Sequence, residues 1–156
     1  MVLQEREKHP PSALLEFEFD LAFRFDFKFN KVLTSEELRS SFLELADLSP
    51  EQRAVLSPMG QFYEGLSYFT VISQRQHVSF VASCAAAFVV MLETRDLKFP
   101  IKTFLIKISP DLPWLVPQIR KARQLMLHKG PELTECPIYL QRFAELRSVE
   151  LQSYLG

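Results

Sequence analysis

Three carboxylates at alternating positions are the first residues whose spacing could support chemistry. They are Glu16, Glu18 and Asp20. In an extended backbone, alternate side chains point the same way at intervals of about 7 Å. The trio could therefore hold a metal ion or exchange protons if further ligands converged on it. Without such ligands it forms the wet face of a strand, which is the interpretation we adopt.

A second cluster, near the C-terminal end of a predicted helix, is basic. It consists of Arg120, Lys121 and Arg123, with His128 and Lys129 one to two turns later. It could bind an acidic partner, or the cations could simply stabilise the C-terminal end of that helix. The formal net charge of the chain is -1. We therefore expect neither nucleic acid nor a membrane as a partner.

The remaining reactive residue types predict no catalytic residue, metal site or cofactor. His9, His77 and His128 are far apart and lack neighbours at metal-binding spacing. Cys84 lies in an apolar run and is expected in the core, whereas Cys136 has no nearby cation to activate its thiol. With four glycines in the whole chain, there is no Gly-rich phosphate loop.

The element most strongly patterned is Leu15–Phe29. Its odd positions are all apolar, six of them Phe, and its even positions are charged except for Ala22. This period of two predicts a strand with one dry face. Burying six Phe side chains is worth roughly 20–35 kcal/mol before entropy. That face must therefore be covered, either by helices of this chain or by a partner.

We predict an α+β fold. Its antiparallel sheet of about four strands is built on the long N-terminal strand, with helices packed on the apolar face and two C-terminal helices. Further strands are expected at Tyr68–Ser73, Val78–Thr94 and Ile101–Ile108. Val78–Thr94 also fits a buried helix, because short apolar runs suit both templates. The strand is preferred because the next segment alternates like an antiparallel neighbour.

Helices are predicted where capping residues precede spaced apolar residues. A capping box at Thr34–Glu37 should open a helix to about Asp47, and Ser49-Pro50 should open a second one. A helix after Pro113 should bury one stripe and end at Gly130-Pro131. The stripe residues are Leu115, Ile119, Ala122 and Met126.

We expect one domain over residues 14–129, preceded by a polar leader, 1–13, and followed by a helical extension, 130–156. The extension either packs on the domain or inserts into a partner. The leader has no secretion-signal pattern. The longest uncharged run, Val78–Leu92, is shorter than the ~20 residues that span a bilayer. Two isolated cysteines favour a reducing compartment, so the predicted location is cytoplasmic.

The excess of amphipathic surface predicts a non-enzymatic protein-binding factor, such as an assembly chaperone or adaptor. The C-terminal helix would lie in a groove of the partner. Its proposed anchors are Tyr139, Leu140, Phe143, Leu146, Leu151 and Tyr154. The Phe-rich strand offers a second contact, and its self-pairing about Ala22 would give a homodimer. Arg120, Lys121 and Arg123 would attract an acidic partner.

Two other functions remain open at this point. One is a small metal-dependent hydrolase or nuclease whose site is built from scattered carboxylates. The other is a ligand pocket beneath the phenylalanines.

Overall fold

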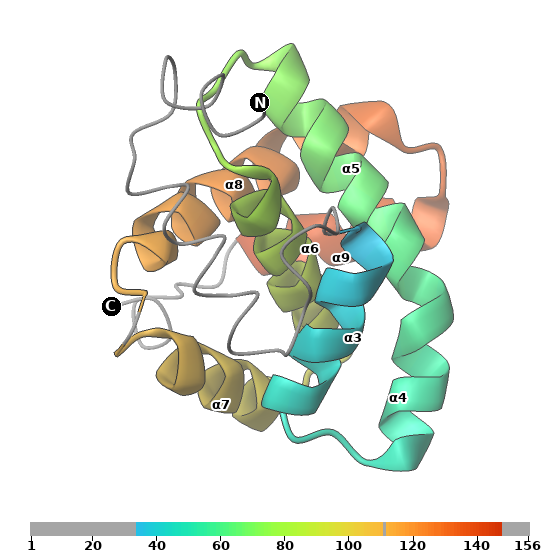
Figure 1. Cartoon of the computed structure of the whole chain (residues 1–156). Helices are drawn as coiled ribbons and strands as arrows, with labels where there is room; N and C mark the ends of the chain where they lie inside the picture. Colours follow the sequence, from blue (N-terminus) through green and yellow to red (C-terminus); the bar gives the residue numbers. More distant parts are fainter. Residues whose placement is uncertain (1–33, 111, 148–156) are drawn as a thin grey trace. The chain divides into compact units, whose positions relative to one another are not determined.

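The computed structural model describes residues 34–110 and 112–147 (Figure 1). By its internal contacts the chain divides into two compact units, Met1–Thr34 and Ser35–Gly156, and every described helix belongs to the second. The α-helices are α3 (Ser35–Leu45), α4 (Pro50–Leu56), α5 (Gly60–Ser73), α6 (Phe80–Thr94), α7 (Lys98–Ile108), α8 (Leu115–Lys129) and α9 (Pro137–Arg147). The short 3-10 helix η1 (Ser57–Met59) joins α4 to α5, and a second one, η2 (Gly130–Leu133), follows α8.

The predicted α+β fold is wrong, because the described part of the chain contains helices and no strand. Tyr68–Ser73, Val78–Thr94 and Ile101–Ile108 were expected to be strands, and they lie mainly in α5, α6 and α7. The proposed central strand, Leu15–Phe29, falls outside the described residues, as does the acidic trio at positions 16, 18 and 20.

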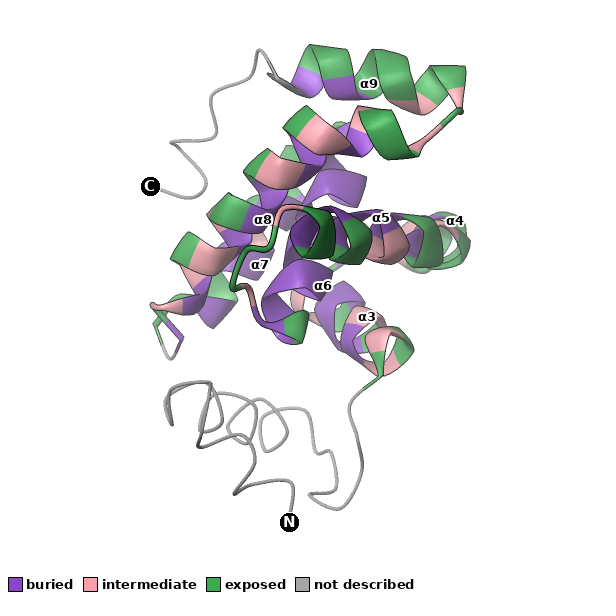
Figure 2. Cartoon of the chain, turned by 90° about the horizontal axis from the view of Figure 1, so that it is seen from above, coloured by how far each residue is buried: buried purple, intermediate pink, exposed green. Residues whose placement is uncertain are grey.

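The domain is organised around α6. Its N-terminal cap is Ser79, whose side-chain oxygen accepts a hydrogen bond from the amide of Ala82 at 3.0 Å. Every residue from Val81 to Thr94 is buried. A helix that is apolar all round is stable only when other elements surround it. Helices α3, α5, α7, α8 and α9 all contact α6 (Figure 2).

Helix α7 shows why an alternating pattern of apolar residues led to the wrong prediction of a strand. The apolar residues at Phe104, Ile106 and Ile108 alternate like those of a strand, but Ile106 is exposed. Ile101, Phe104, Leu105 and Ile108 are buried instead, at the spacing of one helical face. The sequence fits both the two-residue period of a strand and the period of a helix, and tertiary packing selects the helix.

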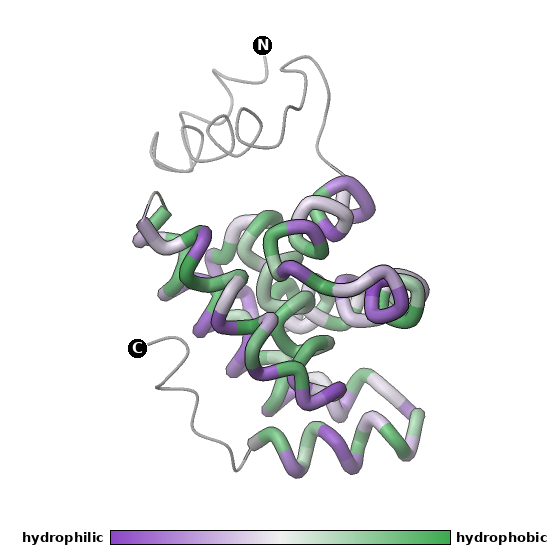
Figure 3. The backbone as a smooth tube through the Cα atoms, turned by 90° about the horizontal axis from the view of Figure 1, so that it is seen from below, coloured by the Kyte–Doolittle hydropathy of each residue, from purple (hydrophilic) through white to green (hydrophobic). Residues whose placement is uncertain are grey.

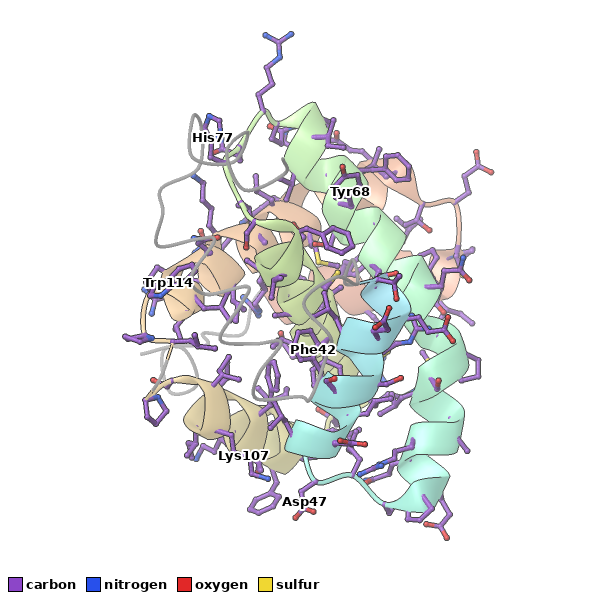
Figure 4. The ribbon with its side chains drawn as sticks, in the orientation of Figure 1. Phe42, Asp47, Tyr68, His77, Lys107 and Trp114 are labelled. Atoms are coloured by element: carbon purple, nitrogen blue, oxygen red, sulfur yellow. The ribbon has the colours of Figure 1, made fainter. Side chains whose placement is uncertain are left out.

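Three phenylalanines from different helices form the aromatic centre of the core. Phe42 of α3 contacts Phe88 of α6 and Phe104 of α7, with ring centroids 5.7 and 5.1 Å apart. Phe88 and Phe104 are 5.0 Å apart at an edge-to-face angle of 67°. Figure 4 shows Phe42 directed into the domain from α3. Such tilted pairs add to the stabilisation that comes from burial alone.

Several predicted helices are confirmed. α3 begins beside the Thr34–Glu37 signal, and Ser49 and Gln52 form a reciprocal capping box at the start of α4. All four residues of the predicted α8 stripe are buried. α8 ends before Gly130, which keeps a right-handed conformation (φ -55°) and begins η2. The outer helices alternate between hydrophilic and hydrophobic segments in Figure 3, as one-sided burial requires.

None of the described helices has both the length and the apolar character that crossing a membrane requires.

Candidate functional site

Helix α9 packs on its own domain. Phe143 is fully buried and Leu146 is also in the core, and α9 contacts α6, α8 and η2. Tyr139 stacks on Phe62 of α5, with centroids 4.5 Å apart and planes 20° apart. Leu140 is the most exposed of the described anchor residues. A partner-binding role for this helix stays a prediction, and its proposed anchors Leu151 and Tyr154 lie outside the described residues.

The three predicted basic residues do not share one surface. Lys121 is exposed and Arg120 is half-buried, whereas Arg123 is buried. The Arg123 guanidinium donates two hydrogen bonds to Glu93 of α6: Nε to Oε1 at 2.8 Å and Nη2 to Oε2 at 2.9 Å. Arg123 therefore ties α8 to the central helix instead of facing an acidic partner.

The pKa of the Glu93 carboxyl is perturbed, as in many catalytic acids, but a substrate has no access to this group. Burial raises the pKa of Glu93, and the hydrogen bonds and charge of Arg123 act in the opposite direction. Perturbed acids often mark active sites, although structural ion pairs perturb pKa values in the same way. Both Glu93 and Arg123 are buried, so a substrate could not reach either group. The pair is therefore structural.

A second, part-buried ion pair joins Arg39 of α3 to Glu64 of α5. Arg39 Nη1 lies 2.6 Å from Glu64 Oε1. Burial raises the pKa of Glu64, while hydrogen bonding and charge from Arg39 lower it. This pair fixes α3 against α5 as the first fixes α8 against α6.

The thiols and histidines form no site that the structure describes. Cys84 is buried, which raises the pKa of its thiol to about 12, so it stays protonated at neutral pH. Cys136 is half-buried, and neither cysteine is in a disulfide. Within residues 34–110 and 112–147, no group of three or more His, Cys, Asp or Glu side chains is placed to hold a metal ion.

An exposed group of apolar side chains, which the sequence analysis missed, lies on the second half of α5 and the start of α6. We call it the aromatic face; it consists of Tyr68, Phe69, Ile72 and Phe80. Their exposed fractions range from 40% to 64%, the largest being that of Phe69. Tyr68 contacts Phe69 and Phe80 edge to face, with ring centroids 6.3 and 6.0 Å apart.

The aromatic face follows from the helical period of α5. Tyr63, Leu66, Ser67 and Thr70 face the core, so Tyr68, Phe69 and Ile72 are turned away from it. The side chain of Tyr68 projects outward from α5 in Figure 4. The signal was present in the sequence, but Tyr68–Ser73 was interpreted as a strand, and a strand would place Tyr68 and Phe69 on opposite faces.

No protein-family model matches this chain, and neither a curated protein nor a solved structure shows detectable similarity to it. The arrangement of the side chains is therefore the basis for a functional proposal.

Proposed function

We propose that this chain is a non-enzymatic protein-binding factor that engages its partner through the aromatic face. The observation that carries the proposal is the exposure, side by side, of Tyr68, Phe69, Ile72 and Phe80. Single exposed apolar residues are ordinary, whereas a contiguous group often marks an interaction site. Aromatic residues are also enriched among the few residues that dominate the energy of protein interfaces.

The size of the aromatic face suits an anchor within a larger interface. Aromatic side chains bury about 150–250 Å² each, so three partly exposed rings offer roughly 300 Å². Covering that area is worth about 7 kcal/mol at 25 cal/mol/Å². Association costs about 4–15 kcal/mol, and stable interfaces bury about 800 Å² per partner. A partner would therefore need further contacts around Tyr68 and Phe69.

The experiment is site-specific photo-crosslinking followed by binding measurements. The full chain carrying a photoreactive phenylalanine analogue at position 69 is expressed in the cells from which the protein comes. On irradiation, the analogue should crosslink to one protein. That protein is then purified and its affinity is measured. We expect Phe69→Ser to weaken binding by at least about tenfold, because it removes a central aromatic anchor. Phe69 is exposed, so the substitution should leave the fold intact.

Phe99→Ser is the matched control, because Phe99 is an exposed phenylalanine on a different helix, α7. It should bind the partner as the unmodified chain does. Leu140→Ala tests the competing surface on α9. An unchanged affinity in Phe69→Ser, or a larger loss in Leu140→Ala than in Phe69→Ser, would contradict the proposal.

A further inference from the structure

A second exposed surface, on α7, has a different chemistry from the aromatic face. Phe99 is 74% exposed and Ile106 is 67% exposed. Lys98, Lys102 and Lys107 are exposed on the same helix. We call these five residues the α7 outer face. Figure 4 shows Lys107 and Tyr68 at opposite ends of the domain, so the α7 outer face and the aromatic face are separate surfaces.

All charged side chains of this helix are positive. α7 carries three lysines and no acidic residue, although the formal net charge of the whole chain is -1. Asp96 lies two residues before α7, and Asp47 follows α3, a helix that contacts α7. Positive charge therefore predominates along the helix itself, and the net charge of the chain does not reveal this.

We propose that the α7 outer face binds peripherally to an anionic lipid surface. Phe99 and Ile106 are seven residues apart, about 10 Å along the axis, and Lys102 lies between them on the same face. Lysine is depleted from the cores of protein interfaces, so this pattern is a poor protein-binding anchor. At a lipid surface, two apolar tips can enter the interface while Lys102 between them and Lys98 beside Phe99 reach the phosphates.

Charge complementarity sets the expected behaviour. Each lysine near an anionic surface strengthens partitioning by roughly fivefold, and this attraction falls off within a Debye length. Peripheral binding of this kind needs no spanning helix. It should therefore be weak, dependent on anionic lipid and reduced by salt.

The test is co-sedimentation of the full chain with vesicles of phosphatidylcholine alone, or with about one third phosphatidylserine. We expect binding to the anionic vesicles to exceed binding to the neutral ones by about tenfold or more and to fall as salt is raised. Lys102→Gln should reduce binding by roughly fivefold, and Phe99→Ser should reduce it severalfold. Phe69→Ser, on the aromatic face, is the matched control and should bind normally.

Equal binding to both vesicle types would overturn the proposal, as would unchanged binding of Phe99→Ser or an equal loss in Phe69→Ser. A photo-crosslinker at position 99 that captures a protein, together with no vesicle binding, would assign the α7 outer face to a protein partner and would also overturn it. This proposal does not depend on the aromatic face, because each substitution serves as the control for the other surface.

Discussion

A β-carbon on Gly60 would lie 2.0 Å from Cδ of Arg39, closer than two carbon atoms can approach without a bond. The Arg39 side chain crosses the backbone at Gly60, and its guanidinium pairs with Glu64 at 2.6 Å. The glycine is not required by its backbone angles, since its φ is an ordinary -59°. Any side chain there would occupy the present path of Arg39, which would have to shift.

Gly60→Ala should therefore destabilise the protein. The substitution forces Arg39 away from Glu64, and a nearly buried carboxylate loses its partner. We expect the free energy of unfolding in urea to fall by about 1–3 kcal/mol, since the arginine can partly relocate. Gly65→Ala is the matched control on the same helix, because nothing lies within 4 Å of its added carbon. It should stabilise by about 0.5–1 kcal/mol through helix propensity.

A double-mutant cycle identifies the cause. In an Arg39→Ala background the obstructing side chain is absent, so Gly60→Ala should become neutral or stabilising. If Gly60→Ala is equally destabilising with and without Arg39, steric displacement of the arginine is not the reason.

Local signals were enough to predict several helices. The Ser49 cap and the α8 stripe depend on residues within a turn or two of each other, and both predictions are confirmed. Val78–Thr94 could not be decided in this way, because valine and phenylalanine favour strands while the alanines suit helices. Burial of that segment by five neighbouring helices determines its structure, and such tertiary context is not readable from a short window.

The candidate sites were harder to predict for a related reason. Arg123 stands among other cations in the sequence, and only the packing of α8 on α6 reveals that it pairs with Glu93. Tyr68 and Phe69 become neighbours on one surface only once α5 is known to be a helix. An error in the period therefore concealed the aromatic face.

Removing Arg123 should be costly, and the cost should depend on pH. Arg123→Met leaves Glu93 buried without its partner, which costs about 3–5 kcal/mol at neutral pH. Without the arginine, burial alone acts on Glu93, so its pKa rises further in the folded state. The folded state then holds a proton that the unfolded state has released, so stability falls as pH rises above about 4.5. Urea denaturation should show a smaller deficit in acid than at neutral pH.

Replacing both members of this pair is the control. Glu93→Leu combined with Arg123→Met leaves no buried charge, and it should recover most of the loss. A deficit in Arg123→Met that is the same at acidic and neutral pH would show that lost packing, and not the stranded carboxylate, causes it.

Tyr63 should make stability sensitive to alkaline pH. Burial raises the pKa of its phenol to about 12, against a hydrogen bond with Thr94 that lowers it. Between pH 10 and about 12 the unfolded state therefore releases this proton before the folded state does. Stability should fall as pH rises through that range. Tyr63→Phe should show a shallower fall in urea denaturation, with a loss of about 1 kcal/mol at neutral pH from the hydrogen bond.

An identical slope in Tyr63→Phe and the unmodified chain would mean that the Tyr63 phenol is not protected by burial.

Helix α9 should behave as part of the core. Phe143 is fully buried, so Phe143→Ala should lower the free energy of unfolding by about 3–5 kcal/mol through lost burial and the cavity it leaves. Leu140→Ala, at an exposed position three residues earlier on the same helix, should cost less than about 1 kcal/mol. Thermal and urea denaturation of the full chain would measure both. If Phe143→Ala leaves the free energy of unfolding unchanged, α9 does not pack on the domain in solution. In that case its apolar side chains are available for the groove of a partner.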